Sequence, residues 1–130
     1  MTVEPRIDAV FIPVRDMDRA IDWYSALLDL PRMSATHEGL IYDLPLPGET
    51  GIMLDGHAHA RGAVIDRRVP LVMFQANEFG PIREFAEIHG SMITEPEDIG
   101  SATVLYLDDP DGNRICIKVP NTFPVCAIDP

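Results

Sequence analysis

The chain alternates between runs with the two-residue period of a β-strand and runs with helical spacing. Residues 6–14 (RIDAVFIPV) have the β-branched and aromatic content of a strand buried on both faces. Asp16 follows in the position of a helix N-cap. The apolar residues after it have the spacing of one buried helical stripe: Met17, Ala20, Ile21, Tyr24, Leu27 and Leu28. The pattern predicts a strand and then a helix over residues 17–28, which ends before Pro31.

The same order of elements then occurs a second time. Short apolar runs predict strands over 32–36, 40–44 and 51–54, whereas residues 55–68 (DGHAHARGAVIDRR) have no clean period and predict a connecting loop. A strand over 71–75, a helix over 81–89 and strands over 91–94, 103–107 and 114–119 follow. The turn DDPDGN joins the last two strands. The order strand, helix, strand, strand, strand thus occurs twice. This repeat predicts two similar units packed side by side.

Composition and charge narrow the possible partners. The 130 residues suit one domain, and a net charge of −11 repels polyanions, so nucleic acid is not an expected partner. No apolar run approaches the eighteen or so residues of a membrane span, and the first residues (MTVEPRID) do not have the pattern of a signal peptide. We therefore expect a cytoplasmic protein without a membrane partner.

Two stretches resemble the recurrent signatures of a known superfamily. VRDMDRAIDWYSALLDL and LDDPDGNRICI are similar to motifs of the vicinal oxygen chelate superfamily, which includes glyoxalase I, extradiol dioxygenases, fosfomycin resistance enzymes and bleomycin resistance proteins. The resemblance covers about residues 7–119. It implies an α+β fold in which two βαβββ modules form an open, curled eight-stranded mixed sheet around a cleft, often completed by a second subunit.

The resemblance also implies how the chain is divided. Module one then spans about residues 6–55, a connecting loop about 56–69, module two about 70–119, and a C-terminal arm 120–130. We expect the protein to be a homodimer.

Metal-dependent members of the superfamily carry their ligands on the first and last strands of each module. The matching positions in this sequence are Ala9, Met53, Pro70 and Cys116. Ala9 and Pro70 have no donor side chain, and the other two are not the His and Glu ligands that a hard or borderline metal needs. We therefore expect neither the usual metal nor another cofactor.

Strand alternation predicts which side chains line the cleft. In the last hairpin, Leu105, Leu107, Ile115 and Ile117 share one apolar face, and Val104, Tyr106, Cys116 and Lys118 share the other. The predicted ligand-binding residues on the cleft side are Phe11, Met53, Val72, Phe74, Tyr106, Arg114 and Cys116. Such a lining suits an apolar small molecule held by a few polar contacts. The same apolar residues could instead fill the cleft as core or form a subunit interface.

These observations lead to a functional hypothesis and an alternative. The hypothesis is a metal-free glyoxalase/bleomycin-resistance-like protein that binds a small, largely apolar molecule, for which the negative net charge favours a cationic, antibiotic-like ligand. The alternative is a metal-dependent lyase, isomerase or dioxygenase with an atypical ligand set, such as Asp55, His57 and His59. Neither a nucleophile arrangement nor a phosphate-binding loop is recognisable, so no catalytic residue is assigned.

Overall fold

The structure, a computed structural model, describes residues 2–62 and 69–121. The chain divides into two compact units. Unit 1 comprises residues 1–66 together with 110–113, and unit 2 comprises residues 67–109 together with 114–130. Within the described ranges, no helix is both long and apolar enough to cross a membrane.

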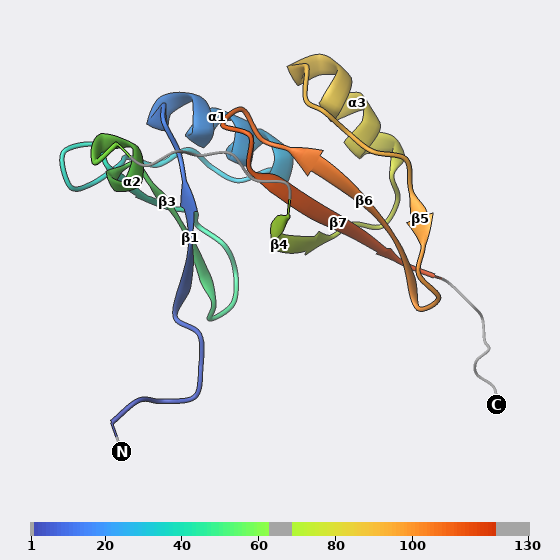
Figure 1. The fold of residues 1–130 in the computed structure, drawn as a ribbon, viewed down its shortest axis with the longest axis horizontal. Helices are drawn as coiled ribbons and strands as arrows, with labels where there is room; N and C mark the ends of the chain where they lie inside the picture. The colour runs from blue at the N-terminus through green and yellow to red at the C-terminus, as the bar shows by residue number, and fades with distance from the viewer. Residues whose placement is uncertain (1, 63–68, 122–130) are drawn as a thin grey trace. The chain divides into compact units, whose positions relative to one another are not determined.

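Unit 1 is a three-stranded mixed sheet with a helix packed on one face. Its elements are β1 (Ala9–Pro13), α1 (Met17–Leu28), β2 (Ile41–Asp43), β3 (Gly51–Asp55) and the short α2 (His57–Ala60). The central strand β3 pairs in parallel with β1 and antiparallel with β2 (Figure 1). α1 begins where the Asp16 side chain accepts a hydrogen bond from the backbone of Arg19, and it ends at Asp29, which has a left-handed backbone.

One face of the unit 1 sheet is buried and the other is open. Register places Ile12 beside Leu54, and both are fully buried, with the stripe of α1 that contains Tyr24 also buried. On the opposite face Phe11 lies beside Met53, and Phe11 is 60% exposed. The expectation that the first strand is buried on both faces is therefore wrong, because only one face of this sheet carries a helix within the unit.

Unit 2 is a four-stranded mixed sheet in the order β4-β7-β6-β5. Its elements are β4 (Pro70–Gln75), α3 (Gly80–His89), β5 (Glu97–Asp98), β6 (Ala102–Asp108) and β7 (Arg114–Pro120). β6 and β7 form the long antiparallel hairpin, drawn in orange and red in Figure 1, and β4 runs parallel beside β7. The predicted apolar face of this hairpin is confirmed, because Leu105, Leu107, Ile115 and Ile117 are each at most 2% exposed.

The two signature motifs of the sequence form one hydrogen-bonded cluster in unit 1. The fully buried carboxylate of Asp111 accepts hydrogen bonds from the Arg15 backbone at 2.9 Å and from the Arg19 guanidinium at 3.2 Å. The side-chain amide of Asn113, also fully buried, donates to the carbonyl oxygen of Pro13 at 2.7 Å. The two motifs therefore bind to each other through Asp111 and Asn113. Hydrogen bonds between a charged donor and a buried carboxylate are among the stronger hydrogen bonds in proteins.

The predicted α+β class with an open mixed sheet is confirmed, and three local predictions are wrong. Residues 32–36 and 91–94 form no strands; only the isolated bridges of Thr36 with Ile41 and of Ile93 with Leu107 remain. With β5, which the sequence did not predict, the described chain has seven strands in two sheets. The predicted loop 55–68 contains α2, and residues 63–68 of it lie outside the described ranges.

Candidate functional site

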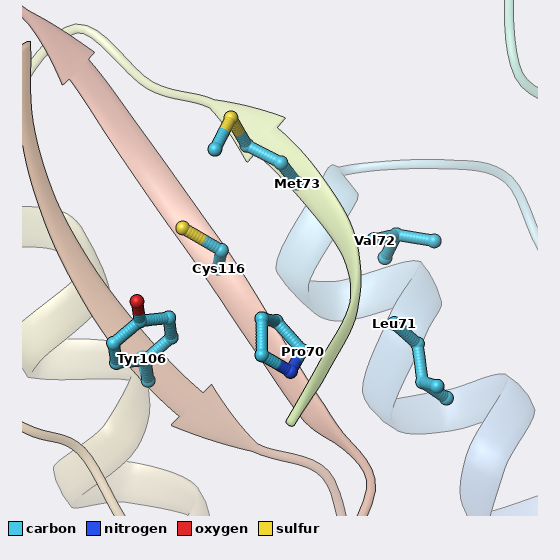
Figure 2. Close-up of a pocket in the computed structure, with 6 residues that line it drawn as sticks. All are labelled: Pro70, Leu71, Val72, Met73, Tyr106 and Cys116. Carbon is cyan, nitrogen blue, oxygen red and sulfur yellow. The ribbon is translucent and has the colours of Figure 1, made fainter.

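The open face of the unit 2 sheet is hollowed around Cys116. Register places Met73 of β4, Cys116 of β7 and Tyr106 of β6 in one row across three adjacent strands. A hollow of about 300 Å³ lies over this row. Its lining residues are Pro70, Leu71, Val72, Met73, Tyr106 and Cys116. Figure 2 shows Met73, Cys116, Tyr106 and Pro70 on one side of the sheet, so the floor of the hollow is apolar apart from a hydroxyl and a thiol.

A β-bulge in β4 changes which side chains face the hollow. Pro70 is opposite Arg114 but Val72 is opposite Ile115, so two steps along β4 match one step along β7 and Leu71 is the extra residue. The face assignment made from unbroken alternation is therefore wrong for β4. Val72 and Phe74 lie opposite Ile115 and Ile117, whereas Met73 shares the face of Cys116.

Of the two ligand-binding residues predicted on β4, Val72 lines the hollow, and the assignment of both as ligand-binding residues remains a prediction. In Figure 2 the Leu71 and Val72 side chains point away from Cys116. Phe74 is not among the lining residues. Pro70 and Met73 also line the hollow, and neither was predicted to bind a ligand. Pro70 did not reveal the bulge in the sequence, because a proline is equally expected at the start of an edge strand, where it lies.

Cys116 lies at the centre of the hollow as a protonated thiol. It is 4% exposed and is a free cysteine. Burial raises the pKa of the Cys116 thiol because the surroundings solvate a thiolate poorly. A thiol of this kind is a weak nucleophile and a weak metal ligand at neutral pH, since both roles require the thiolate.

Tyr106 brings a polar group to the edge of this apolar floor. Its backbone is fixed by hydrogen bonds to Thr94, and the Arg114 guanidinium lies 5.7 Å from its ring centroid. Within residues 2–62 and 69–121 the Tyr106 hydroxyl has no hydrogen-bond partner. This hydroxyl can therefore donate a hydrogen bond to a molecule in the hollow, or accept one from it.

Arg114 lies beside the hollow without lining it. Its Nε donates to Asp108 Oδ1 at 3.0 Å, and this hydrogen bond raises the pKa of Arg114. The guanidinium is thereby held between the Asp108 carboxylate and the Tyr106 ring. Arg114 can position Tyr106, but its own charge is already largely engaged.

In unit 1, Phe11 and Met53 are neighbours on the open sheet face, as strand alternation predicted. Their shared row also includes Asp43 of β2. Their assignment as ligand-binding residues remains a prediction.

The positions that match the superfamily's metal ligands do not fit a metal. In unit 1, Ala9 has no donor atom, and in unit 2 Pro70 has none and Cys116 is protonated. In the part of the chain that the structure describes, no three His, Cys, Asp or Glu residues form a group that could hold an ion. No step of a reaction can therefore be assigned to a bound metal.

The alternative ligand set of Asp55, His57 and His59 is not brought together either. The Asp55 carboxylate accepts a hydrogen bond from the backbone N–H of His57 at 2.8 Å and lies 3.0 Å from His57 Nδ1. His57 and His59 are two residues apart on α2, so their side chains project about 200° apart around the helix axis. Asp55 thus orders the start of α2.

Comparisons with known proteins identify the family. The family model for the Glyoxalase/Bleomycin resistance protein/Dioxygenase superfamily matches residues 6–117. The chain belongs to this superfamily. A comparison with proteins of established function found no match.

Solved structures with the same fold differ widely in sequence from this chain. TnmS3, an antibiotic binding protein from Streptomyces sp. CB03234, is 17% identical with a TM-score of 0.70, over 93% of this chain and 99% of that one. UcmS2 is 21% identical with a TM-score of 0.68, over 89% and 98%. Lactoylglutathione lyase from Agrobacterium tumefaciens is 16% identical with a TM-score of 0.63, over 89% and 94%. At these identities the comparisons show the fold alone.

Proposed function

We propose that this protein is a metal-free member of the superfamily that binds a small, largely apolar molecule in the hollow over Met73, Cys116 and Tyr106. The observation that carries the proposal is the hollow itself, an apolar floor of about 300 Å³ with one hydroxyl available for hydrogen bonding. Its volume is at the lower end of small-molecule sites, which suits a ligand of one or two rings.

The chemistry of the hollow favours binding over catalysis. Cys116 is held as a thiol, Arg114 is engaged by Asp108, and the Tyr106 hydroxyl has no base beside it among the described residues. These groups can orient an apolar molecule, but they form neither a nucleophile with its base nor an acid-base pair. The antibiotic binding protein among the structural neighbours is consistent with this proposal through its fold.

Two further properties belong to the same proposal. The open face around Phe11, 60% exposed, supports a homodimer in which apolar sheet faces become covered. Sedimentation should then give about twice the mass of the 14.4 kDa chain. We also propose that the chain consists of the two modules given above, about residues 6–55 and 70–119, and that the protein is cytoplasmic.

Thermal denaturation with a ligand panel tests the proposed function. The panel contains small aromatic compounds and cationic antibiotics, because the net charge of −11 attracts cations at long range. A ligand present at a hundred times its dissociation constant should add about 2.7 kcal/mol of stability.

A matched pair of variants locates the site. Met73→Lys places a charge in the hollow and should abolish the shift, whereas Met92→Lys changes a methionine that is 70% exposed and does not line the hollow, and should retain it. Equal responses of the two variants would place the ligand elsewhere, and no response across the panel would contradict the proposed function.

A further inference from the structure

Lys118 is the only lysine of the chain. It lies on β7 two residues beyond Cys116 and therefore on the same face of the sheet as the hollow. The sequence has 21 acidic residues against ten basic ones, yet Lys118 has no carboxylate partner within residues 2–62 and 69–121. The half-buried side chain of Lys118 is thus left without an acidic partner on the face that carries the hollow.

The register places Lys118 on the strand next to Tyr106. Tyr106 is opposite Cys116, and Lys118 is opposite Val104, so Tyr106 and Lys118 are diagonal neighbours on adjacent strands. Diagonal neighbours of this kind are about 7–8 Å apart at the backbone, within reach of long side chains. The face consequently offers two hydrogen-bond donors at one edge of an apolar floor.

The other charges on this face do not compete for the same ligand group. Arg114 is held by Asp108, as described above. Glu97 lies opposite Val104 on β5, one strand farther from β7 than Val104, and it forms no ion pair among the described residues. Lys118, two residues beyond Cys116 on the same face of β7, is therefore the charge left for a molecule that lies over Cys116 and extends along this strand.

Local charge and net charge favour opposite ligands. The net charge of −11 favours cations, but this attraction is screened beyond about 8 Å at physiological ionic strength. Lys118 is not among the lining residues, so a ligand reaches it only by extending from the hollow past Cys116 along β7. A charge-assisted hydrogen bond formed there, in a partly desolvated site, is screened much less. Contact with these two donors should outweigh the long-range attraction.

From this arrangement we infer that the hollow selects an apolar, aromatic molecule that carries an anionic oxygen group, such as a carboxylate, which the Lys118 ammonium and the Tyr106 hydroxyl bind together. The inference rests on the proposed function and specifies its ligand class. It replaces the cationic ligand expected from net charge with an anionic one.

Calorimetric titration with three compounds of the same aromatic body tests the inference. 2-Naphthoic acid is anionic at neutral pH, 2-naphthamide is neutral and 2-naphthylmethylamine is cationic. The acid should bind the wild-type protein about tenfold more tightly than the amide, and the amine most weakly. Lys118→Met keeps the length of the side chain and should remove the preference for the acid.

Two variants distinguish a local contact from a change in net charge. Arg83→Met removes one positive charge from an exposed position of α3 and should leave the tenfold preference intact. Tyr106→Phe should weaken the binding of the acid and of the amide by a similar factor, since both compounds can accept a hydrogen bond from the Tyr106 hydroxyl. Unchanged melting temperatures of the free variants establish that each of them is folded.

The outcomes separate the inference from the proposed function. Tight binding of all three compounds without preference, or a preference that survives Lys118→Met, would overturn the inference and leave the proposed function standing. Tightest binding of the amine would overturn it in favour of a cationic ligand. Failure of all three to bind would overturn the inference, and the proposed function would fail with it only if no compound of the thermal-denaturation panel bound either.

Discussion

At the scale of single residues, the environment of a side chain decides whether it has a chemical or a structural role. Cys116 occupies a position where metal-dependent relatives carry a ligand, but it is buried beside Met73 and Tyr106, so it contributes an apolar surface. Asp111 belongs to a cluster of acids that could be taken for a solvated turn. It is instead fully buried and holds Arg15 and Arg19.

The raised pKa of Cys116 predicts a loss of stability at high pH. Above the usual thiol pKa of 9.0 the unfolded chain releases the proton while the folded chain retains it, so stability contributed by this residue is complete below pH 9.0 and declines as pH rises. The decline cannot exceed about 1.4 kcal/mol per pH unit.

Urea unfolding of the wild type and of Cys116→Ala at pH 8 and pH 10 measures this effect. The wild type should lose more free energy of unfolding between the two pH values than the variant, which has no thiol at this position. Equal losses would show that the Cys116 thiol titrates alike in the folded and unfolded chains.

Removal of the Asp111 carboxylate should destabilise the fold. Asp111→Ala leaves the Arg15 backbone N–H and the Arg19 guanidinium without this acceptor, which should cost about 2–4 kcal/mol of unfolding free energy. Glu84→Gln, which also removes one negative charge, changes an exposed residue of α3 and should stay within about 0.5 kcal/mol of the wild type. Similar small effects of the two substitutions in chemical denaturation would contradict a structural role for Asp111.

At the scale of elements, the sequence predicted helices better than strand faces. The bounds of α1 agree with the prediction because Asp16 and the apolar stripe both specify them locally. The bulge in β4 could not be read from alternation, because alternation assumes that every residue pairs, and Leu71 does not. Residues 32–36 have the composition of a strand but make only one bridge, because strand formation depends on a partner elsewhere in the chain.

The short helix α2 leads to a prediction about metal content. Because Asp55 is hydrogen-bonded to His57 and the two histidines project in different directions, this segment should not hold a metal ion. Protein purified without chelator should contain far less than one equivalent of zinc, nickel, iron or manganese by elemental analysis. A stoichiometric metal that is lost from the His57→Ala, His59→Ala double variant would support the metal-dependent alternative.

At the scale of the whole molecule, the residues that identify the superfamily differ from the residues that would bind the proposed ligand. The signature motifs meet in the Asp111 cluster, which stabilises unit 1, whereas the hollow lies on the sheet of unit 2. The motifs in the sequence therefore predicted the superfamily and the α+β fold. The location of the hollow could not be predicted, because it depends on a bulge and on the side chain of Met73.

The central claim, that a small molecule binds over Met73, Cys116 and Tyr106, is tested most directly by methyl NMR of protein labelled at its methionine methyl groups. Titration with 2-naphthoic acid should shift the Met73 signal, assigned through Met73→Leu, because the ring of the ligand would lie against that methyl group. Met92, at 70% exposed and not among the lining residues, should not respond. A Met73 signal that stays fixed while the ligand binds, or shifts at Met92 alone, would contradict the account.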